Sequence, residues 1–417
     1  MTKLFQLLPG LFLLWANGLV RADDWPEFRG PTGQGIAPEG HYPVEWSASK
    51  NVAWRKPIPG KGWSSPIVSG GFVYLTTAVA AEETNRRDLS LRTLCLNAQT
   101  GETIWDKEVF RQDGSQAPAI HSKNSHASPT PLTDGQRLYV HFGHQGTACL
   151  DLQGNLIWKN RGIHYQPVHG NGGTPILTEN ALVFSCDGYD KPFVIGLDRA
   201  KGNVIWKTAR NSESFKKFSF STPLLITVNG KQEIICPGSG AVCAYDPRTG
   251  REIWRVTYEG YSVIPRPIFG HGLVFVSSGF ESPSLLAIRP DGRGDVTTSH
   301  VAWTLRKGAP LTSSPLLVDD ELYLVSDSGI VSCVDASTVK VHWQERIGGN
   351  YSASPLYADG KIYCQSEEGT GVVLKAGKRF QVLARNSIGE PTLASYAVSD
   401  GAFFIRTESH LFRIQHR

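Results

Sequence analysis

Short runs of alternating apolar and polar residues recur from about residue 51 to the end of the chain. Alternation with a period of two is typical of β-strands that bury one face. The clearest runs are residues 72–75, 138–140, 182–184, 273–276, 322–325 and 361–364. Several of them follow a turn such as Asp134-Gly135 or Asp359-Gly360, where glycine tolerates a positive φ. No segment carries a sustained 3.6-residue stripe, so we predict an all-β protein.

The predicted strands belong to one repeating unit of about 40 to 63 residues, the size of a four-stranded propeller blade. Each copy opens with small residues before a proline and closes with a tryptophan. The prolines are Pro66, Pro129, Pro175, Pro223, Pro267, Pro315 and Pro355, and an eighth, degenerate copy reads Ala394-Ser395-Tyr396. The tryptophans are Trp105, Trp158, Trp206, Trp254, Trp303 and Trp343, with Phe380 standing in for the seventh. The sequence therefore predicts an eight-bladed β-propeller.

The eighth copy has no tryptophan of its own, because the chain ends shortly after residues 411–414. A matching stretch, Asn51-Val52-Ala53-Trp54-Arg55, stands before the first proline signal instead. We predict that this N-terminal strand completes the last blade, which would remove two open sheet edges. Residues 51–417 would then form a single propeller domain, preceded by an N-terminal extension over residues 23–50.

The segment from Ala244 to Trp254 resembles the tryptophan-docking motif of pyrroloquinoline quinone (PQQ) type propeller repeats, small-x-Asp-x-x-Thr-Gly-x-x-x-Trp. Looser copies run from Cys95 to Trp105, Gly196 to Trp206 and Cys333 to Trp343. The opening Trp25-Pro26-Glu27-Phe28-Arg29-Gly30-Pro31 is also similar to the start of exported PQQ-like repeat proteins. One tryptophan per blade at a fixed place is best explained as a ring packed between sheets. We assign this structural role to Trp54, Trp105, Trp158, Trp206, Trp254, Trp303 and Trp343, and keep Trp25 and Trp63 as possible binding aromatics.

Residues 1–22 are typical of a cleaved signal peptide, with an apolar run after Lys3 and small residues before the expected cleavage site. The formal charge of +4 falls to about +2 without Lys3 and Arg21, which disfavours a nucleic-acid partner. No later stretch is long and apolar enough to span a bilayer. The seven cysteines form no adjacent pair and no CxxC, and we expect them to be small buried residues. The protein is expected to be a periplasmic or secreted monomer without a lipid anchor.

Ligands of propellers usually bind at the mouth of the central channel, where the inner loops converge. Acidic residues and one histidine follow the predicted central strands there: Asp187, Asp327, Glu367, Glu368 and His144. Solvated loop residues are the simplest interpretation, although such a ring could also hold Ca²⁺. Arg266 occupies a position that is small in the other copies. It could clamp a carboxylate, either of a ligand or of neighbouring blades. His141 and His144 would need a turn between them to share a metal ion.

The resemblance implies two different functions. An exported, non-catalytic propeller could act as a binding or scaffold module for a protein, peptide or glycan in the cell envelope, as a related lipoprotein does in outer-membrane protein assembly. The alternative is a PQQ-dependent alcohol or sugar dehydrogenase with a Ca²⁺-assisted site at the channel mouth. In such enzymes the cofactor commonly lies between a tryptophan and a disulfide of adjacent cysteines, and this chain lacks that pair. The binding module is therefore preferred, and no cofactor or metal is assigned.

Overall fold

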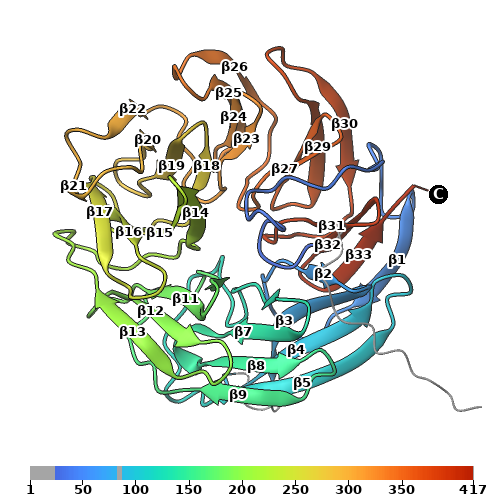
Figure 1. Ribbon diagram of the computed structural model, residues 1–417. Coiled ribbons are helices and arrows are strands. Elements are labelled where there is room, and N and C mark those ends of the chain that lie inside the picture. Colours follow the sequence, from blue (N-terminus) through green and yellow to red (C-terminus); the bar gives the residue numbers. More distant parts are fainter. Residues whose placement is uncertain (1–23, 82–86, 417) are drawn as a thin grey trace, which may run out of the picture.

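The computed structural model describes residues 24–81 and 87–416; the predicted signal peptide lies outside them. Over the described residues the strands form eight sheets arranged in a ring around a central channel (Figure 1). This confirms the predicted all-β, eight-bladed propeller. The first strand of each blade lies nearest the centre and the last lies at the rim.

Each blade contains four antiparallel strands, named here from the inside outwards, and the sheet of blade 4 has a fifth, parallel strand at its rim. Blades 1 to 4 are β2 (Ile67–Ser69), β3 (Phe72–Ala80), β4 (Leu89–Asn97), β5 (Thr103–Gln112); β6 (Leu132–Thr133), β7 (Arg137–His141), β8 (Thr147–Asp151), β9 (Leu156–Asn160); β10 (Ile176–Leu177), β11 (Ala181–Cys186), β12 (Phe193–Asp198), β13 (Val204–Ala209); and β14 (Leu224–Val228), β15 (Lys231–Gly238), β16 (Ala241–Tyr245), β17 (Glu252–Thr257). Blades 5 to 8 are β18 (Ile268–Gly270), β19 (Leu273–Ser277), β20 (Leu285–Ile288), β22 (Val301–Leu305); β23 (Leu316–Val318), β24 (Glu321–Val325), β25 (Ile330–Asp335), β26 (Val341–Arg346); β27 (Leu356–Ala358), β28 (Lys361–Gln365), β29 (Thr370–Lys375), β30 (Val382–Ser387); and β31 (Ala397–Ser399), β32 (Ala402–Arg406), β33 (His410–Ile414), β1 (Val52–Pro57).

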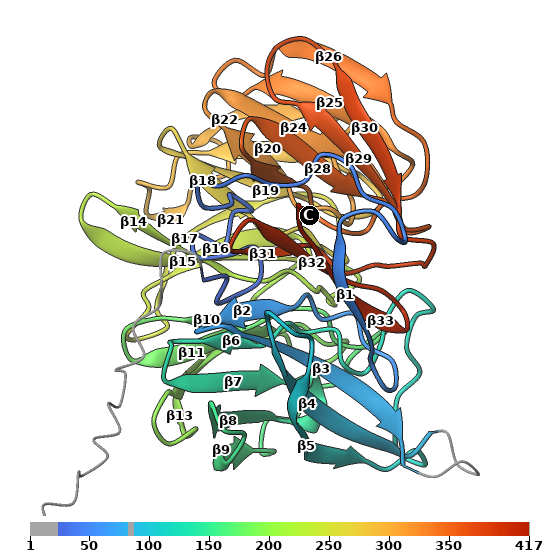
Figure 2. The same ribbon diagram turned by 90° about the vertical axis from the view of Figure 1, so that its right-hand side faces the viewer.

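The ring is closed by a strand from the other end of the chain. β1 pairs antiparallel with β33, from Val52 opposite Ile414 to Pro57 opposite His410. Figure 2 shows the two strands side by side. The predicted closure of the last blade is confirmed. Without β1 the edge of β33 would expose unpaired backbone groups.

A belt of hydroxyl groups joins the inner strands around the channel. One residue stands two positions before the first strand of each blade, followed by proline or, in blade 8, by Tyr396. In seven of the eight blades its backbone N–H donates to the hydroxyl of the equivalent residue in the next blade, at 2.9–3.1 Å. The bonds run Ser65 to Thr130, Thr130 to Thr174, Thr174 to Thr222, Arg266 to Ser314, Ser314 to Ser354, Ser354 to Ser395 and Ser395 to Ser65. This explains why the repeat keeps a small hydroxyl residue at this position, which we call the belt position.

The belt corrects the sequence alignment of the second blade. Thr130, followed by Pro131 and β6, occupies the belt position, so the matching proline is Pro131 and not Pro129. The sequence Ser128-Pro129-Thr130-Pro131 offers two small-residue–proline pairs, and only the hydrogen bonds between blades distinguish them.

The tryptophan at each rim packs against the following blade. Six indole nitrogens donate to a carbonyl in the next blade's outer turn at 2.9–3.2 Å: Trp54 to Ala98, Trp105 to Leu152, Trp158 to Arg199, Trp206 to Pro247, Trp303 to Ala336 and Trp343 to Gly377. Trp254 differs and donates to Glu233 within its own blade at 2.9 Å. Gly250 shows why the motif needs glycine, because its φ is +69° and a Cβ atom would lie 2.4 Å from the Trp206 ring.

The seventh blade departs from the predicted pattern. In blade 6, Trp343 pairs with Cys333 beside a β-bulge. At the equivalent bulge of blade 7, Ala384 pairs with Val373, so alanine occupies the tryptophan position. Phe380 lies in the preceding turn, and its ring packs on Trp343 of blade 6 with 5.1 Å between ring centroids. The prediction that Phe380 replaces the seventh tryptophan is therefore wrong, because Phe380 lies four residues before that position. The large ring still fills the space between the two blades.

The N-terminal segment crosses one face of the ring. Trp25 bridges Val68 of β2, the Pro26 carbonyl accepts the Thr133 N–H, and Ile36 bridges Tyr357 of β27. Figure 1 shows this segment in dark blue, looping into the middle of the ring. Trp25 is buried in the core and does not face a ligand site. The segment therefore covers the channel at the face where the inner strands end.

All seven cysteines are buried and unpaired, as expected. In the part of the chain that the structure describes, no helix is long and apolar enough to cross a membrane.

Candidate functional site

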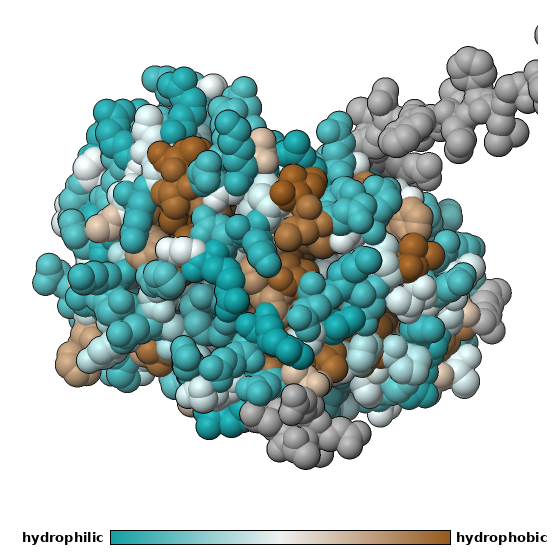
Figure 3. Space-filling model, turned by 90° about the horizontal axis from the view of Figure 1, so that it is seen from below, coloured by the Kyte–Doolittle hydropathy of each residue, from teal (hydrophilic) through white to brown (hydrophobic). Residues whose placement is uncertain are grey.

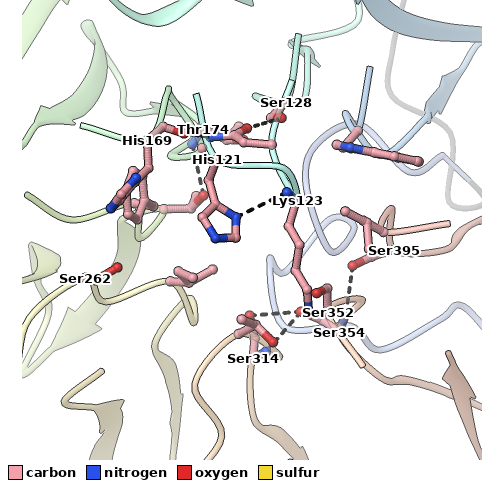
Figure 4. A pocket seen from close by; sticks show the side chains of 18 of the residues that line it. His121, Lys123, Ser128, His169, Thr174, Ser262, Ser314, Ser352, Ser354 and Ser395 are labelled. Atoms are coloured by element: carbon pink, nitrogen blue, oxygen red, sulfur yellow. Dashed lines mark hydrogen bonds between the residues drawn. The ribbon is translucent and has the colours of Figure 1, made fainter. Parts of the chain in front are cut away.

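A pocket of about 640 Å³ occupies the central channel and opens on the face opposite the N-terminal segment. Its wall comes mainly from the connections that enter the inner strands, and Phe28 of the N-terminal segment lines it from the far end. Phe28 therefore narrows the pocket at the end that faces the N-terminal segment. Figure 4 looks at its side chains from close by.

Hydroxyl groups of the belt line the pocket wall. All seven hydroxyl residues at the belt position contribute: Ser65, Thr130, Thr174, Thr222, Ser314, Ser354 and Ser395. Each accepts a backbone N–H from the neighbouring blade, so its own hydrogen can be donated elsewhere. Ser354 donates to Ser314 at 3.0 Å. The remaining hydroxyls can donate to a ligand or to water.

Aromatic side chains form one side of the pocket. The Phe218 ring lies 5.8 Å from Tyr261 and 6.0 Å from Phe220, with Phe280 and Trp63 also lining the wall. The rings come from loops before β14 and β18, after β19 and before β2. They give the pocket flat apolar surfaces beside a polar wall.

Two lysines lie at the mouth, and each already has a partner. Lys123, from the connection between β5 and β6, reaches across the mouth towards Ser352 (Figure 4). Its ammonium pairs with Glu367 of blade 7 at 2.8 Å. The Lys216 ammonium donates to the Tyr261 hydroxyl at 2.8 Å, and this hydrogen bond raises the pKa of Lys216. Asp327 is the carboxylate that lines the pocket. The charges are therefore close to balanced.

The imidazole groups of His121 and His169 sit above the aromatic side, with 5.6 Å between their rings. The pKa of His169 is lowered by partial burial, and the His121 and Lys216 charges add to this. His169 is thus held in its neutral form at pH 7, able both to donate and to accept a hydrogen bond.

The floor of the pocket is fixed by Arg266, which lies beneath it and not at the mouth. Its guanidinium donates to the Phe28 carbonyl at 2.5 Å, the Glu27 carboxylate at 3.0 Å and the Pro223 carbonyl at 3.0 Å. The carboxylate that Arg266 clamps therefore belongs to the N-terminal segment, an alternative that the sequence did not suggest. Burial raises the pKa of Glu27, and the Arg266 charge opposes this. Arg29 is also buried beside Arg266, and burial followed by that repulsion lowers its pKa to about 9.

The structure separates the acidic residues that we grouped from the sequence. Asp327 accepts the N–H groups of Leu311 and Thr312 at 3.2 Å, and burial raises its pKa. Glu367 is held by Lys123 and by the Ser352 hydroxyl at 2.6 Å. Burial opposes ionisation of Glu368, but hydrogen bonds from the Ser366 and Asn350 side chains lower its pKa.

Asp187 and His144 lie outside the central pocket, within blades 2 and 3. Asp187 is buried against Arg210 at 3.1 Å, and burial raises the pKa of Asp187 to about 6 against the pull of that charge. His144 contacts the Asn171 amide at 3.1 Å, and burial, then the His126 charge, lowers its pKa to about 4. Among the described residues no three His, Cys, Asp or Glu side chains gather as a metal site.

The comparisons with known proteins agree with this architecture. The family model described as outer membrane protein assembly factor BamB matches residues 43–161, 92–295 and 293–382. The chain belongs to this family.

Solved structures similar to this BamB-family chain include a BamB and a quinohemoprotein alcohol dehydrogenase. BamB from Moraxella catarrhalis has a TM-score of 0.58 at 12% identity, covering 87% of this chain and 99% of that one. The quinohemoprotein alcohol dehydrogenase from Comamonas testosteroni has a TM-score of 0.68 at 11% identity, covering 96% and 82%. At these identities the likeness shows the fold alone.

Among curated proteins, methanol dehydrogenase [cytochrome c] subunit 1 from Methylobacterium organophilum is 27% identical over 165 residues. The match covers 33% of this chain and 24% of that protein, so this chain spans about a quarter of that relative's length. The match supports the repeat architecture of the BamB-family chain.

Sequence reasoning missed most of the pocket-lining residues of this BamB-family propeller. His121, Lys123, Lys216, Phe218 and Tyr261 lie in connections between blades, where the repeat has no pattern to align. The length of the connection between β5 and β6 was the one available signal, because an unusually long connection can reach across the channel.

His141 should make the protein sensitive to acid. Its ring is fully buried against Phe184, and burial, then the His144 charge, lowers its pKa to about 3 from 6.5. Because the folded state holds the neutral ring, the His141 contribution to the free energy of unfolding is fully present above pH 6.5. It decreases as the pH falls towards 3, by on the order of 4 kcal/mol. Chemical denaturation of the His141→Asn variant from pH 7 to 4 should show a weaker pH dependence than the wild type. The exposed control His164→Asn should retain the full dependence, and an equal slope for all three proteins would refute this origin.

Proposed function

We propose that this protein is a non-catalytic binding propeller of the cell envelope that holds the end of a glycan chain in its central pocket. The observation that carries the proposal is the pocket wall, a belt of hydroxyl groups facing aromatic rings with nearly balanced charge. Sugar rings stack their apolar faces on aromatic side chains and exchange hydrogen bonds through their hydroxyls. A pocket narrowed at its floor by Phe28 suits the end of a chain better than an internal segment.

Two features position a saccharide. The Phe218 and Tyr261 rings stand in a T-shaped arrangement and present two faces at different angles, which supports stacking of one or two sugar rings. Opposite them, the hydroxyls of Ser65, Ser314 and Ser395 can donate to ring and hydroxyl oxygens. The Lys123–Glu367 pair spans the mouth and would exchange partners with an entering chain.

The pocket fits a PQQ- and Ca²⁺-dependent dehydrogenase less well. Calcium needs six to eight oxygen ligands, commonly from several carboxylates. Asp327 lines the pocket as a single carboxylate, and the neighbouring Glu367 is bound to Lys123 and Ser352. The cysteines are buried within the blades. We therefore derive no catalytic step for this site.

Soluble oligosaccharides titrated into the protein test the proposal by calorimetry and by the change in intrinsic tryptophan fluorescence, to which Trp63 in the pocket wall contributes. We expect saturable binding, and Phe218→Ala or Tyr261→Ala should weaken it by about tenfold or more. Phe215→Ala is the matched control, because this nearby side chain is 96% exposed and should not affect binding. An oligosaccharide with chemically capped ends should also bind more weakly, because the pocket is proposed to hold the end of the chain.

A parallel titration with PQQ and Ca²⁺ separates the two functions. Saturable quinone binding with dye-coupled oxidation of an alcohol or sugar would overturn the binding-module proposal. A peptide that bound with Phe218-dependent affinity while no saccharide did would overturn the glycan proposal and retain a binding module.

A further inference from the structure

The rim of blade 4 carries a fifth strand that the other blades lack. β21 (Gly294–Asp295), part of the long turn between β20 and β22, pairs parallel to β17 with Trp254 opposite Gly294 and Arg255 opposite Asp295. The Val296 N–H donates to the Arg255 carbonyl at 2.9 Å, and Thr297 accepts the Thr257 N–H at 2.9 Å. The chain thus satisfies one of its own open sheet edges.

Side chains of the added strand complete this contact. Val296 is buried and packs into the cluster that contains Ile253 and Trp254. Asp295 stands opposite Arg255, and its carboxylate accepts the Thr297 N–H at 2.9 Å and the Thr297 hydroxyl at 2.6 Å. These hydrogen bonds, and then the Arg255 charge, lower the pKa of Asp295, while the Arg255 guanidinium itself pairs with Glu252 at 2.6 Å. The edge of β17 therefore recognises an acidic residue followed by a β-branched apolar residue.

Blades 2 and 3 present the same edge without a covering strand. Both carry isoleucine, tryptophan and a basic residue in the order found at β17: Ile157-Trp158-Lys159 on β9 and Ile205-Trp206-Lys207 on β13. In all three blades the tryptophan pairs with the neighbouring strand next to the same bulge. The Lys159 and Lys207 carbonyls therefore point outward, as the Arg255 carbonyl does.

Exposure distinguishes the covered edge from the open ones. Ile157 and Ile205 are each 44% exposed, with Leu156 and Val204 exposed beside them, whereas Ile253 is partly buried. Figure 3 views the side of the ring on which β9 lies and shows brown apolar patches within a teal surface. Blade 6 has an exposed Val341 but glutamine after its tryptophan, so it lacks the basic residue.

We infer that the outer edges of blades 2 and 3 bind an extended segment of a partner protein by strand addition. The segment would run parallel to β9 or β13 and carry an acidic residue opposite Lys159 or Lys207, as Asp295 lies opposite Arg255. The β-branched apolar residue that follows would lie opposite Asn160 or Thr208, and the residue two positions before the acidic one would lie over Ile157 or Ile205. Main-chain hydrogen bonds to an exposed edge supply affinity in such complexes, and the side chains supply specificity. This site is distinct from the central pocket and does not depend on the glycan proposal.

A labelled peptide copying residues 290–300 of this chain, which contains Gly294-Asp295-Val296-Thr297, is the probe. Fluorescence anisotropy with the full protein should show saturable binding. Combining Ile157→Ser and Ile205→Ser should weaken it by about tenfold. The matched control Val341→Ser alters an exposed apolar residue at the blade 6 rim and should leave binding unchanged.

Charge exchange provides the more specific test. Lys159→Glu with Lys207→Glu should weaken binding of the native peptide and favour a peptide in which the residue corresponding to Asp295 is replaced by lysine. Unchanged melting temperatures would show that these surface variants are folded. The inference would be overturned by the absence of saturable binding, or by isoleucine variants of blades 2 and 3 that bind the peptide as tightly as the wild type. It would also be overturned if charge exchange left the affinity of both peptides unchanged. Self-association that these same variants abolish would also overturn it, since the edges would then pair with a second copy.

Discussion

Deleting residues 24–57 should leave a chain that aggregates and no longer melts cooperatively. The deletion removes β1, so the edge of β33 loses its partner from Val52 to Pro57. It also removes Trp25, Tyr42 and Trp46 from the core cluster shared by blades 1, 7 and 8. Losing three large buried rings costs about 3–5 kcal/mol each, which equals or exceeds a typical total stability of about 5–15 kcal/mol. Thermal unfolding by circular dichroism and size-exclusion chromatography measure the result.

Arg55→Ser is the control for this deletion. Arg55 lies on β1, but its side chain is half exposed, and its ion-pair partner Glu390 keeps hydrogen bonds from Thr407 and Ser409 when Arg55 is replaced. Such pairs contribute about 0–1 kcal/mol, so the variant should melt close to the wild type. A truncated chain that stays soluble with a sharp melting transition would show that the ring holds without its N-terminal strand.

Replacing Arg266 by alanine should destabilise the fold by about 2–3 kcal/mol and release the pocket floor. The guanidinium is 2% exposed and joins Glu27 and Phe28 of the N-terminal segment to Pro223 of blade 4. Its removal leaves Glu27 and two carbonyls without their donor. A fully buried pair would cost about 3–5 kcal/mol, but the Glu27 side chain keeps 22% of its surface exposed, which reduces the loss.

A double-mutant cycle with Glu27→Gln separates the ion pair from the carbonyl contacts. We expect the combined variant to lose less than the sum of the single variants in urea unfolding, because both remove the same pair. Limited proteolysis should cut the N-terminal segment faster in Arg266→Ala. Wild-type unfolding and wild-type cleavage in that variant would mean that the clamp contributes nothing to the floor.

The overall fold was predictable because the same local sequence pattern recurs in each repeat. Alternating strands, turn glycines and one tryptophan per unit each act within a few residues, and eight copies average out local errors. Even the closure by the strand around Trp54 followed from counting a missing element. The misalignments were local: Pro129 was chosen over Pro131, and Phe380 was placed at the position of Ala384.

The site was much less predictable. Asp327 and Glu367 were found because they follow central strands, and both lie at or beside the pocket. Asp187, in the equivalent place, is instead turned into the blade by Arg210, a residue of the next strand pair that no local pattern links to it. Arg266 was recognised as exceptional, but its partner lies 239 residues earlier in the chain.

The sequence by itself determined the blade, the number of blades, the closing strand and the structural tryptophans, since these depend on periodic, short-range chemistry. Only the tertiary structure decided what fills the channel and which edges remain open. The pocket is assembled from irregular connections that meet only when the ring closes, and its floor is a segment that precedes the repeats. The rim edges differ because the turn between β20 and β22 of blade 5 pairs with β17 of blade 4. The repeat pattern of the sequence does not predict where an irregular turn will pack.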